Sequence, residues 1–357
     1  MKRLILLIIV VLVLAVAGLG AWTYSNLHKP ITHSKNGQYI DIPKGTSPSA
    51  IINKLASEGI IQHEWPLKLY LKLTGRGATL KAGEYDFPSP ISPIAVIAKL
   101  QQGERRLNRL TLIEGWTRWD IARAMARVPE FKLENDSQAL ELMNNVNLIS
   151  DLDPVAKNLE GYLFPDTYEF PPETTPADLI EMMVKRFRNV WKPDWTDRAR
   201  SLGFTPREIV TTASIIETEA KLADERPIVA SVIYNRLKKD IPLAVDSSVI
   251  YASKLEGKWR YDGKVYLSDI QRRSPYNTRL YAGLPPGPVA SPGESSLKAA
   301  LNPVTSDYLY YVRNPDRDDG AHNFYSNGAD FETGVQALRK WERDRDAEEA
   351  RKKAQTR

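Results

Sequence analysis

The chain has 357 residues, of which 42% are hydrophobic and 26% charged, the composition of a globular protein of about two or three domains. It contains no cysteine, which excludes disulfides, thiolate metal sites and cysteine nucleophiles. The formal net charge of +5 is mild and lies partly in the C-terminal tail, so we expect no nucleic-acid partner.

The N-terminus predicts a membrane anchor. Lys2 and Arg3 precede an uninterrupted apolar run over residues 4–22, and about 19 apolar residues span a bilayer as a helix. The two cations favour a cytoplasmic N-terminus with the bulk of the chain outside. The alternative is a cleaved signal peptide, because the sequence A-V-A at 15–17 is similar to a cleavage site. The run continues past it, so we expect a cytoplasmic stub and anchor over residues 1–24.

A polar tether over residues 25–36 and an α+β module over residues 37–105 are predicted next. In the module, a strand at 38–42 precedes a helix that Ser47 caps and Pro48 starts. The other predicted elements are helices at 66–73 and 93–103 and a strand at 83–87. The segment I-P-K-G-T-S-P-S-A-I-I-N-K-L resembles a LysM-like module, a type that binds N-acetylated glycans. A plain α+β packing domain is the alternative.

A larger α+β region is predicted over residues 106–340. Its elements are a strand at 109–113, a helix opened by the capping box T-R-W-D at 117–120, a polar helical segment within 129–153, an aromatic strand and turn at 161–170, and helices at 175–191, from 206, and at 229–237. The chain is then rich in loops up to residue 311. Residues 341–357 carry alternating charges, which predict a solvated helix that frays into a disordered tail.

The helix from residue 206 carries the main chemical candidate, in the sequence T-A-S-I-I-E-T-E at 212–219. Thr205 is its expected N-cap, and Glu208 completes a capping box. Apolar residues recur at helical spacing and place Glu217 at the edge of a buried stripe. Desolvation there would raise the pKa of Glu217 toward that of a general acid. The alternative is an ordinary surface glutamate with a salt-bridge partner.

Other chemistries find little support in the sequence. The four histidines (His28, His33, His63 and His322) are scattered without metal-ligand spacing. The sequence S-S-L-K at 295–298 matches the S-x-x-K of penicillin-binding enzymes, but no K-T-G accompanies it. The chain has neither G-x-S-x-G nor a phosphate-binding loop. A carboxylic acid remains as the catalytic group.

The loop at 274–293 has too much proline and glycine for regular structure, and it predicts a groove wall. Flat faces for sugar rings are expected from Trp259, Tyr261, Tyr276 and Tyr281. Asn277 and Thr278 could hydrogen-bond acetamido and hydroxyl groups. The alternative is that the tyrosines pack the loop down.

Several motifs resemble one family, the endolytic murein transglycosylases, also called MltG or YceG-like proteins. The motifs are A-S-I-I-E-T-E, E-R-P-I-V-A-S-V-I-Y-N-R-L, Y-N-T and G-L-P-P-G-P, in the right order from the anchor to about residue 337. The resemblance implies that Glu217 is the catalytic acid and that residues 106–340 form the catalytic domain. It also implies cleavage of the β-1,4 bond between N-acetylmuramic acid and N-acetylglucosamine inside glycan strands.

The resemblance implies a mechanism with one acid. Glu217 would protonate the leaving oxygen and then take the proton of the muramic C6 hydroxyl, which closes a 1,6-anhydro ring. The substrate's acetamido group or Asp246 would stabilise the oxocarbenium-like transition state. Glu219 lies about 200° around the helix from Glu217. We expect it to be structural or a partner for Arg226.

The sequence departs from the family pattern at a few polar positions. Lysine, glutamine, proline and histidine are usual where this chain has Thr218, Ala244, Ser247 and Phe331. These changes affect secondary contacts, not the acid. The expected substrate-binding residues are Tyr276, Asn277, Thr278, Asp246, His322 and Glu219.

The expected fold is α+β, with one transmembrane helix, a LysM-like module and a larger catalytic domain that lies in the periplasm of a bacterium. The expected partners are the inner membrane, peptidoglycan glycan strands and peptidoglycan synthases of the penicillin-binding type, with no metal or other cofactor. Two other functions stay open. One is a lysozyme-like hydrolase, in which Asp246 or Glu219 guides water. The other is a noncatalytic cell-wall binding scaffold that relies on the LysM-like module.

Overall fold

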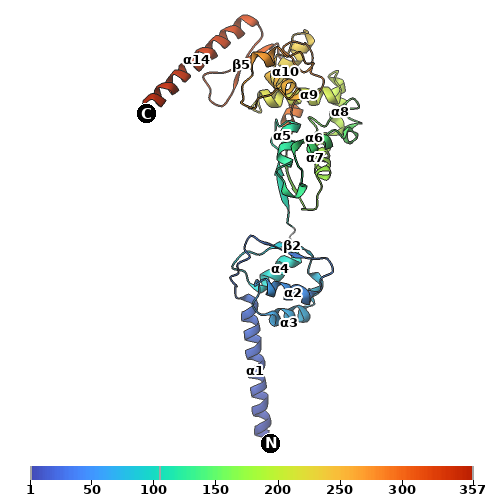
Figure 1. The fold of residues 1–357 in the computed structure, drawn as a ribbon, viewed down its shortest axis with the longest axis vertical. Helices are drawn as coiled ribbons and strands as arrows, with labels where there is room; N and C mark the ends of the chain where they lie inside the picture. Colours follow the sequence, from blue (N-terminus) through green and yellow to red (C-terminus); the bar gives the residue numbers. More distant parts are fainter. Residues whose placement is uncertain (1, 104–105, 356–357) are drawn as a thin grey trace. The chain divides into compact units, whose positions relative to one another are not determined.

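The computed structural model describes residues 2–103 and 106–355 (Figure 1). The chain divides into two compact units between Asn108 and Arg109. Helices predominate in the described residues, and their strands form two-stranded sheets. This mixture of helix and strand confirms the coarse fold prediction. The ends of the expected stub, module and tail that fall on residues 1, 104–105 and 356–357 lie outside the described residues.

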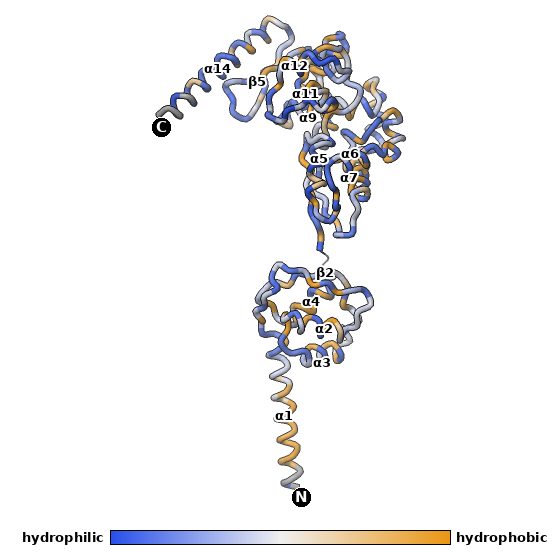
Figure 2. The backbone as a smooth tube through the Cα atoms, in the orientation of Figure 1, coloured by the Kyte–Doolittle hydropathy of each residue, from blue (hydrophilic) through white to orange (hydrophobic). Residues whose placement is uncertain are grey.

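The first unit begins with a long apolar helix, α1 (Lys2–His28). Its segment Leu6–His28 has a mean hydropathy of 2.7 and is long and apolar enough to cross a membrane. The apolar side chains described along it are mostly exposed, and Figure 2 shows the helix as a hydrophobic stretch. A helix that is apolar on all sides without protein packing suits a lipid environment. The structure is therefore consistent with a single-pass anchor.

The rest of the first unit packs helices against a small sheet. β1 (Tyr39–Ile42) pairs antiparallel with β2 (Gly83–Asp86), and Ile40 lies opposite Tyr85. The helices are α2 (Pro48–Ser57), α3 (Glu64–Thr74), the 3-10 turn η1 (Arg76–Thr79) and α4 (Pro93–Gln102). Ser47 caps α2 as expected, and its side chain accepts a hydrogen bond from the Ala50 N–H. The LysM-like assignment of this unit stays a prediction.

The second unit carries most of the elements. They are β3 (Asn108–Thr111), α5 (Arg118–Met125), η2 (Pro129–Phe131), α6 (Asp136–Leu142), η3 (Val146–Ile149), β4 (Thr167–Phe170), α7 (Pro176–Val190), α8 (Pro193–Ser201), α9 (Pro206–Glu219), α10 (Arg226–Lys238), α11 (Asp246–Leu255), α12 (Leu267–Ile270), α13 (Glu294–Leu301), β5 (Tyr310–Arg313), β6 (His322–Tyr325) and α14 (Gly328–Gln355). β3 pairs with β4, and β5 pairs antiparallel with β6.

α9 is the central helix of this unit and packs against α10 and α13. Its capping box forms as predicted, because Thr205 and Glu208 exchange side-chain and backbone hydrogen bonds. Burial is wider than the apolar stripe and includes the polar residues Thr211, Thr212 and Ser214. The Ser214 hydroxyl accepts a hydrogen bond from the Val289 N–H at 3.0 Å. The part of α9 that precedes Glu217 is therefore buried and hydrogen-bonded to the loop that carries Val289.

Some helices were not predicted. The segment expected to be loop-rich contains α11 and α12, and α8 was also missed. These helices are short, and proline or glycine flanks several of them. The polar segment within 129–153 is helical as expected, with one short helix between two 3-10 turns. The helix expected over the charged C-terminal residues is part of α14, which begins at Gly328 and continues to Gln355.

Candidate active site

The end of α9 brings Glu217 into contact with α10. The Glu217 side chain is only 4% exposed, and the Arg226 side chain is 9% exposed. Arg226 Nη2 lies 2.9 Å from Glu217 Oε1, and Nη1 lies 3.4 Å from Oε2. The two-pronged contact is possible because Arg226 opens α10 directly after the short turn that follows α9.

A backbone N–H completes the contacts of this carboxylate. Gly293, the N-cap residue of α13, donates its N–H to Glu217 Oε2 at 2.8 Å. The guanidinium and the N–H both stabilise the carboxylate form of Glu217. The sequence predicted either a desolvated Glu217 or a surface Glu217 in a salt bridge. In the structure Glu217 is both buried and ion-paired.

A second carboxylate, Glu114, lies beside the same arginine. It belongs to the loop between β3 and α5, and its Oε2 is 3.9 Å from Arg226 Nη2. Its side chain is about half exposed, at 52%. Partial burial raises the pKa of the Glu114 carboxyl, and the charge of Glu217 adds to the rise against the opposing charge of Arg226. We call Glu114, Glu217, Arg226 and Gly293 the Glu217 cluster.

Two backbone hydrogen bonds hold the Glu114 loop in place. The Gly115 N–H donates to the Ser291 carbonyl at 2.9 Å, and the Ser291 N–H donates to the Trp116 carbonyl at 2.7 Å. Gly293 then passes so close to Glu114 that an added Cβ would overlap its carboxylate. Any larger residue at this position would have to push the Glu114 carboxylate aside, although the backbone angles of Gly293 are ordinary. The sequence analysis missed Glu114, whose only signal is its position directly before Gly115 and a capped helix.

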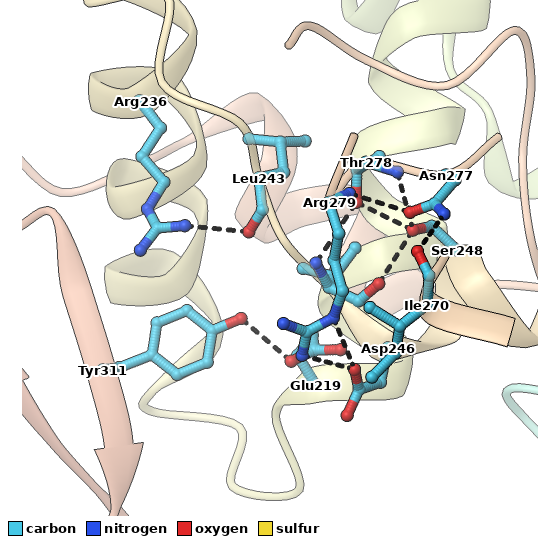
Figure 3. Close-up of polar contacts among 11 residues, drawn as sticks. Glu219, Arg236, Leu243, Asp246, Ser248, Ile270, Asn277, Thr278, Arg279 and Tyr311 are labelled. Atoms are coloured by element: carbon cyan, nitrogen blue, oxygen red, sulfur yellow. Dashed lines mark hydrogen bonds and ion pairs between the residues drawn. The ribbon is translucent and has the colours of Figure 1, made fainter. Parts of the chain in front are cut away.

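Glu219 faces a different set of neighbours (Figure 3). The Tyr311 hydroxyl donates to Glu219 Oε2 at 2.9 Å. Burial raises the pKa of the Glu219 carboxyl, the Tyr311 hydrogen bond opposes the rise, and the nearby charge of Asp246 adds to it. The expectation that Glu219 pairs with Arg226 was wrong. Arg226 contacts the side of α9 that presents Glu217, and Glu219 lies about 200° around the helix.

Asp246 and His322 are brought toward Glu219, and each has its own partner. Asp246, the first residue of α11, forms an ion pair of 2.6 Å with Arg279. The partner of His322 is Glu225: the His322 backbone N–H donates to Glu225 Oε1 at 2.8 Å, and His322 Nδ1 lies 2.8 Å from Glu225 Oε2. Its ring packs edge-on against Tyr311, with ring centres 5.4 Å apart. We call Glu219, Asp246, Arg279, Tyr311 and His322 the Glu219 cluster.

Asn277 and Thr278 are buried inside the loop. Asn277 Nδ2 donates to the carbonyls of Ile270 and Arg272, both at 2.8 Å. Thr278 Oγ1 lies 2.7 Å from the Ser248 hydroxyl. These contacts, drawn in part in Figure 3, support a role in shaping the loop. Contact of either residue with a sugar stays a prediction.

The aromatic candidates have separate locations. Tyr276 packs against Tyr251, with ring centres 4.8 Å apart, and lines a cavity of about 310 Å³ with Glu160 and Arg207. Burial raises the pKa of Glu160 to about 7. Trp259 and Tyr261 pack edge-on with ring centres 6.5 Å apart. Tyr261 and Tyr281 are exposed. In the part of the chain that the structure describes, no three His, Asp or Glu side chains are grouped to hold a metal ion.

Comparisons with known proteins place the chain among proteins of one kind. A sequence model of the YceG-like family matches residues 40–337. The chain is 36% identical to the "Endolytic murein transglycosylase" of Bacillus subtilis, over 82% of this chain and 84% of that protein. It is 30% identical to the protein of the same name from Streptococcus pneumoniae, over 85% of this chain and 58% of that longer protein. A crystal structure of a YceG-like protein from Listeria monocytogenes is similar at a TM-score of 0.56 and 29% identity, covering 83% of this chain and 97% of that one.

Proposed function

The chain belongs to the YceG-like family, whose matched relatives are named endolytic murein transglycosylases, and we propose that it cuts peptidoglycan glycan strands internally. The proposed bond is the β-1,4 bond between N-acetylmuramic acid and N-acetylglucosamine, and the proposed products carry 1,6-anhydromuramic ends. One observation carries the assignment to a residue. Glu217, at the position of the family's acid, is a buried carboxyl fixed by Arg226 and by the Gly293 N–H.

The proposed reaction uses Glu217 twice. Its proton passes to the glycosidic oxygen as the bond from C1 to that oxygen breaks. The resulting carboxylate takes the proton of the muramic C6 hydroxyl, and the C6 oxygen bonds to C1. No water is consumed, so the second carboxylate that an ordinary glycosidase uses as nucleophile or water activator is not required. General acid–base steps of this kind contribute roughly 10²–10⁴-fold to a rate.

The oxocarbenium-like transition state also needs charge stabilisation. Asp246 was one candidate, but Arg279 pairs with it at 2.6 Å and its side chain is more than half exposed. A neutralised, hydrated carboxylate contributes little field at a distance. We therefore favour the substrate's own acetamido group. Tyr276, His322 and Glu219 stay candidates for binding the flanking sugars.

The products of digestion test this function. Isolated glycan strands are digested with the full-length protein in detergent, in ¹⁸O-labelled water, and the ends are identified by mass spectrometry. We expect 1,6-anhydromuramic ends without label, because the attacking oxygen comes from the substrate. Labelled reducing ends as the main product would establish the hydrolase instead. Binding without any cut would leave the noncatalytic scaffold.

The proposed location is the bacterial inner membrane, with a cytoplasmic N-terminus and the catalytic unit in the periplasm. The length of α1 and the cation Arg3 before its apolar run support it. There the enzyme would trim or terminate new strands beside peptidoglycan synthases. Of the reporters fused to the C-terminus, those that work outside the cytoplasm should be active and those that work in the cytoplasm should be inactive. A mature N-terminus near Gly18 would show a cleaved signal peptide.

The module over residues 37–105 is proposed to hold glycan strands for the catalytic domain at residues 106–340. The support is its resemblance to a LysM-like module and its separation in sequence from Glu217. Deleting the module while keeping the anchor should weaken binding to sacculi and leave activity on short soluble strands. Unchanged binding would make the module a spacer.

A further inference from the structure

Arg226 is shared by two carboxylates, and the reaction proposed above uses only one of them. Its Nη2 atom lies 2.9 Å from Glu217 Oε1 and 3.9 Å from Glu114 Oε2. We propose that Glu114 is a positioning residue that serves as the second counter-ion of Arg226, so that Glu217 can carry the proton it transfers. This inference rests on the proposed function and deepens it.

The need for a second counter-ion follows from the contacts of Glu217. An acid catalyst must be protonated when the substrate binds, but Arg226 and the Gly293 N–H both stabilise the carboxylate. Protonating Glu217 would also leave Arg226, which is 9% exposed, without its main counter-charge. A buried charge without a partner is strongly unfavourable. A carboxylate next to the guanidinium removes that obstacle.

Glu114 has the position and the freedom for this role. Its side chain is about half exposed, and its Oε2 already lies 3.9 Å from Arg226 Nη2, within ion-pair distance. With a proton on Glu217, Arg226 and Glu114 form a neutral pair. Without that proton, the three side chains carry one net negative charge, which favours taking the proton back.

Gly293 contacts the carboxyl groups of both Glu217 and Glu114. The Gly293 N–H binds Glu217 Oε2, and its Cα lies against the Glu114 carboxylate. The hydrogen bonds between Ser291 and the segment Gly115 and Trp116 keep the loop of Glu114 at this distance. Burial raises the pKa of the Glu114 carboxyl, and the nearby charge of Glu217 adds to the rise.

The charged groups around the pair belong to few elements. α9 contributes Glu217, α10 contributes Arg226, and the segment before α13 contributes the uncharged Gly293 N–H. The charged sequence neighbours of Gly293 and Arg226 have partners of their own. Glu294 pairs with Lys298 at 2.7 Å, and Glu225 pairs with His322 at 2.8 Å. Arg226 is therefore the cation that the two carboxyls share.

The test compares pH–rate profiles of the full-length wild type and Glu114→Gln in detergent, with Glu181→Gln on the exposed face of α7 as the matched control. The rate falls at high pH as Glu217 loses its proton. Removing the negative charge of Glu114 lowers the proton affinity of Glu217. We expect the alkaline limb of kcat to move to lower pH by about one unit. The rate near neutral pH then falls about tenfold and recovers in more acidic buffer.

A purely structural role would lower the rate equally at every pH and leave the limb in place, and that result would overturn the proposal. Glu114→Asp, which withdraws the carboxylate without removing its charge, should move the limb in the same direction by less. If Glu114→Gln does not fold, an unmoved limb in Glu114→Asp overturns the proposal. Failure of the proposed function is distinguishable, because the wild type would then form no anhydro ends.

Discussion

Glu217 and Glu219 lie two residues apart on α9, and their surroundings are opposite in kind. Glu217 is held by a guanidinium and a backbone N–H, both of which favour its ionised form. Glu219 is held by the Tyr311 hydroxyl, near the negative charge of Asp246, and its pKa is raised by burial. The same type of side chain is therefore paired with a guanidinium on one side of the helix and with a tyrosine hydroxyl on the other.

The comparison shows that a motif with two glutamates need not be a catalytic pair. An α-helix rotates about 100° per residue, so side chains two residues apart face different neighbours. α10 and the segment before α13 cover the side of Glu217, whereas β5 and α11 supply the neighbours of Glu219. Which glutamate can act on a substrate depends on these neighbours.

The largest effect is expected for Glu217→Gln. This change keeps the shape of the side chain and removes the transferable proton. General acid–base contributions run at roughly 10²–10⁴-fold, and one group here fills both roles, so the loss should lie near 10⁴-fold. The release of anhydro-ended fragments measures it, with Glu181→Gln as the control. Full activity in Glu217→Gln would remove Glu217 from the mechanism.

The buried ion pair should be next in size. Arg226→Met leaves the Glu217 carboxylate buried without its counter-charge, so the free energy of unfolding should fall by about 3–5 kcal/mol. The double variant Arg226→Met with Glu217→Gln should recover a large part of the loss, because no buried charge remains. Urea unfolding followed by tryptophan fluorescence measures both. Equal stability of Arg226→Met and wild type would contradict the pairing.

Glu219→Gln should change the pH dependence of stability and cost far less activity than Glu217→Gln. A carboxyl whose folded-state pKa is raised stabilises the fold below its unfolded pKa, and this stability is lost as pH rises through the folded pKa. Glutamine does not ionise, so the variant lacks this pH dependence. The stability of the variant relative to wild type should therefore be higher at about pH 8 than at about pH 4. Thermal unfolding at both values measures it. Parallel pH curves would show that Glu219 is not desolvated.

The smallest effect is expected for Gly293→Ala. The added methyl group would overlap the Glu114 carboxylate, which is the far end of a half-exposed side chain and can move aside. Stability should therefore change by less than about 1 kcal/mol. The rate at neutral pH should fall modestly as Glu114 leaves Arg226. In a Glu114→Gln background the same change should have little further effect, and an undiminished effect there would show that Gly293 acts on Glu217 directly.

Local signals made much of the fold predictable. The caps at Ser47 and Thr117 and the capping box at Thr205 start their helices as expected, because each cap is a contact within one turn. The family resemblance, which several motifs carried, is confirmed by the match over residues 40–337. α11 was missed because it is short and depends on packing against α9.

Only those site residues that lie in a recognisable motif could be predicted from the sequence. Glu217 was found from its helix and from the resemblance, but its role stays a prediction. Glu114 and the ion pair of Arg226 depend on contacts between distant segments, which no local pattern reports. Asn277 and Thr278 were singled out as polar loop residues, whereas their hydrogen bonds fold the loop itself. Asn and Thr side chains in loops readily hydrogen-bond to nearby backbone groups, so polarity alone does not mark a ligand contact.

The hydrogen bonds between Trp116 and Ser291 also have a consequence for folding. They join the beginning of the second unit to the segment before α13, and Gly293 reaches back 76 residues to Glu217. Contacts of long sequence separation form late, because loop-closure entropy opposes them. A nascent chain that ends before Ser291 lacks both the N–H on Glu217 and the two backbone hydrogen bonds that hold the Glu114 loop. We therefore expect an incompletely synthesised or translocated chain to be inactive, which would protect the wall from a cutting enzyme that has not finished folding.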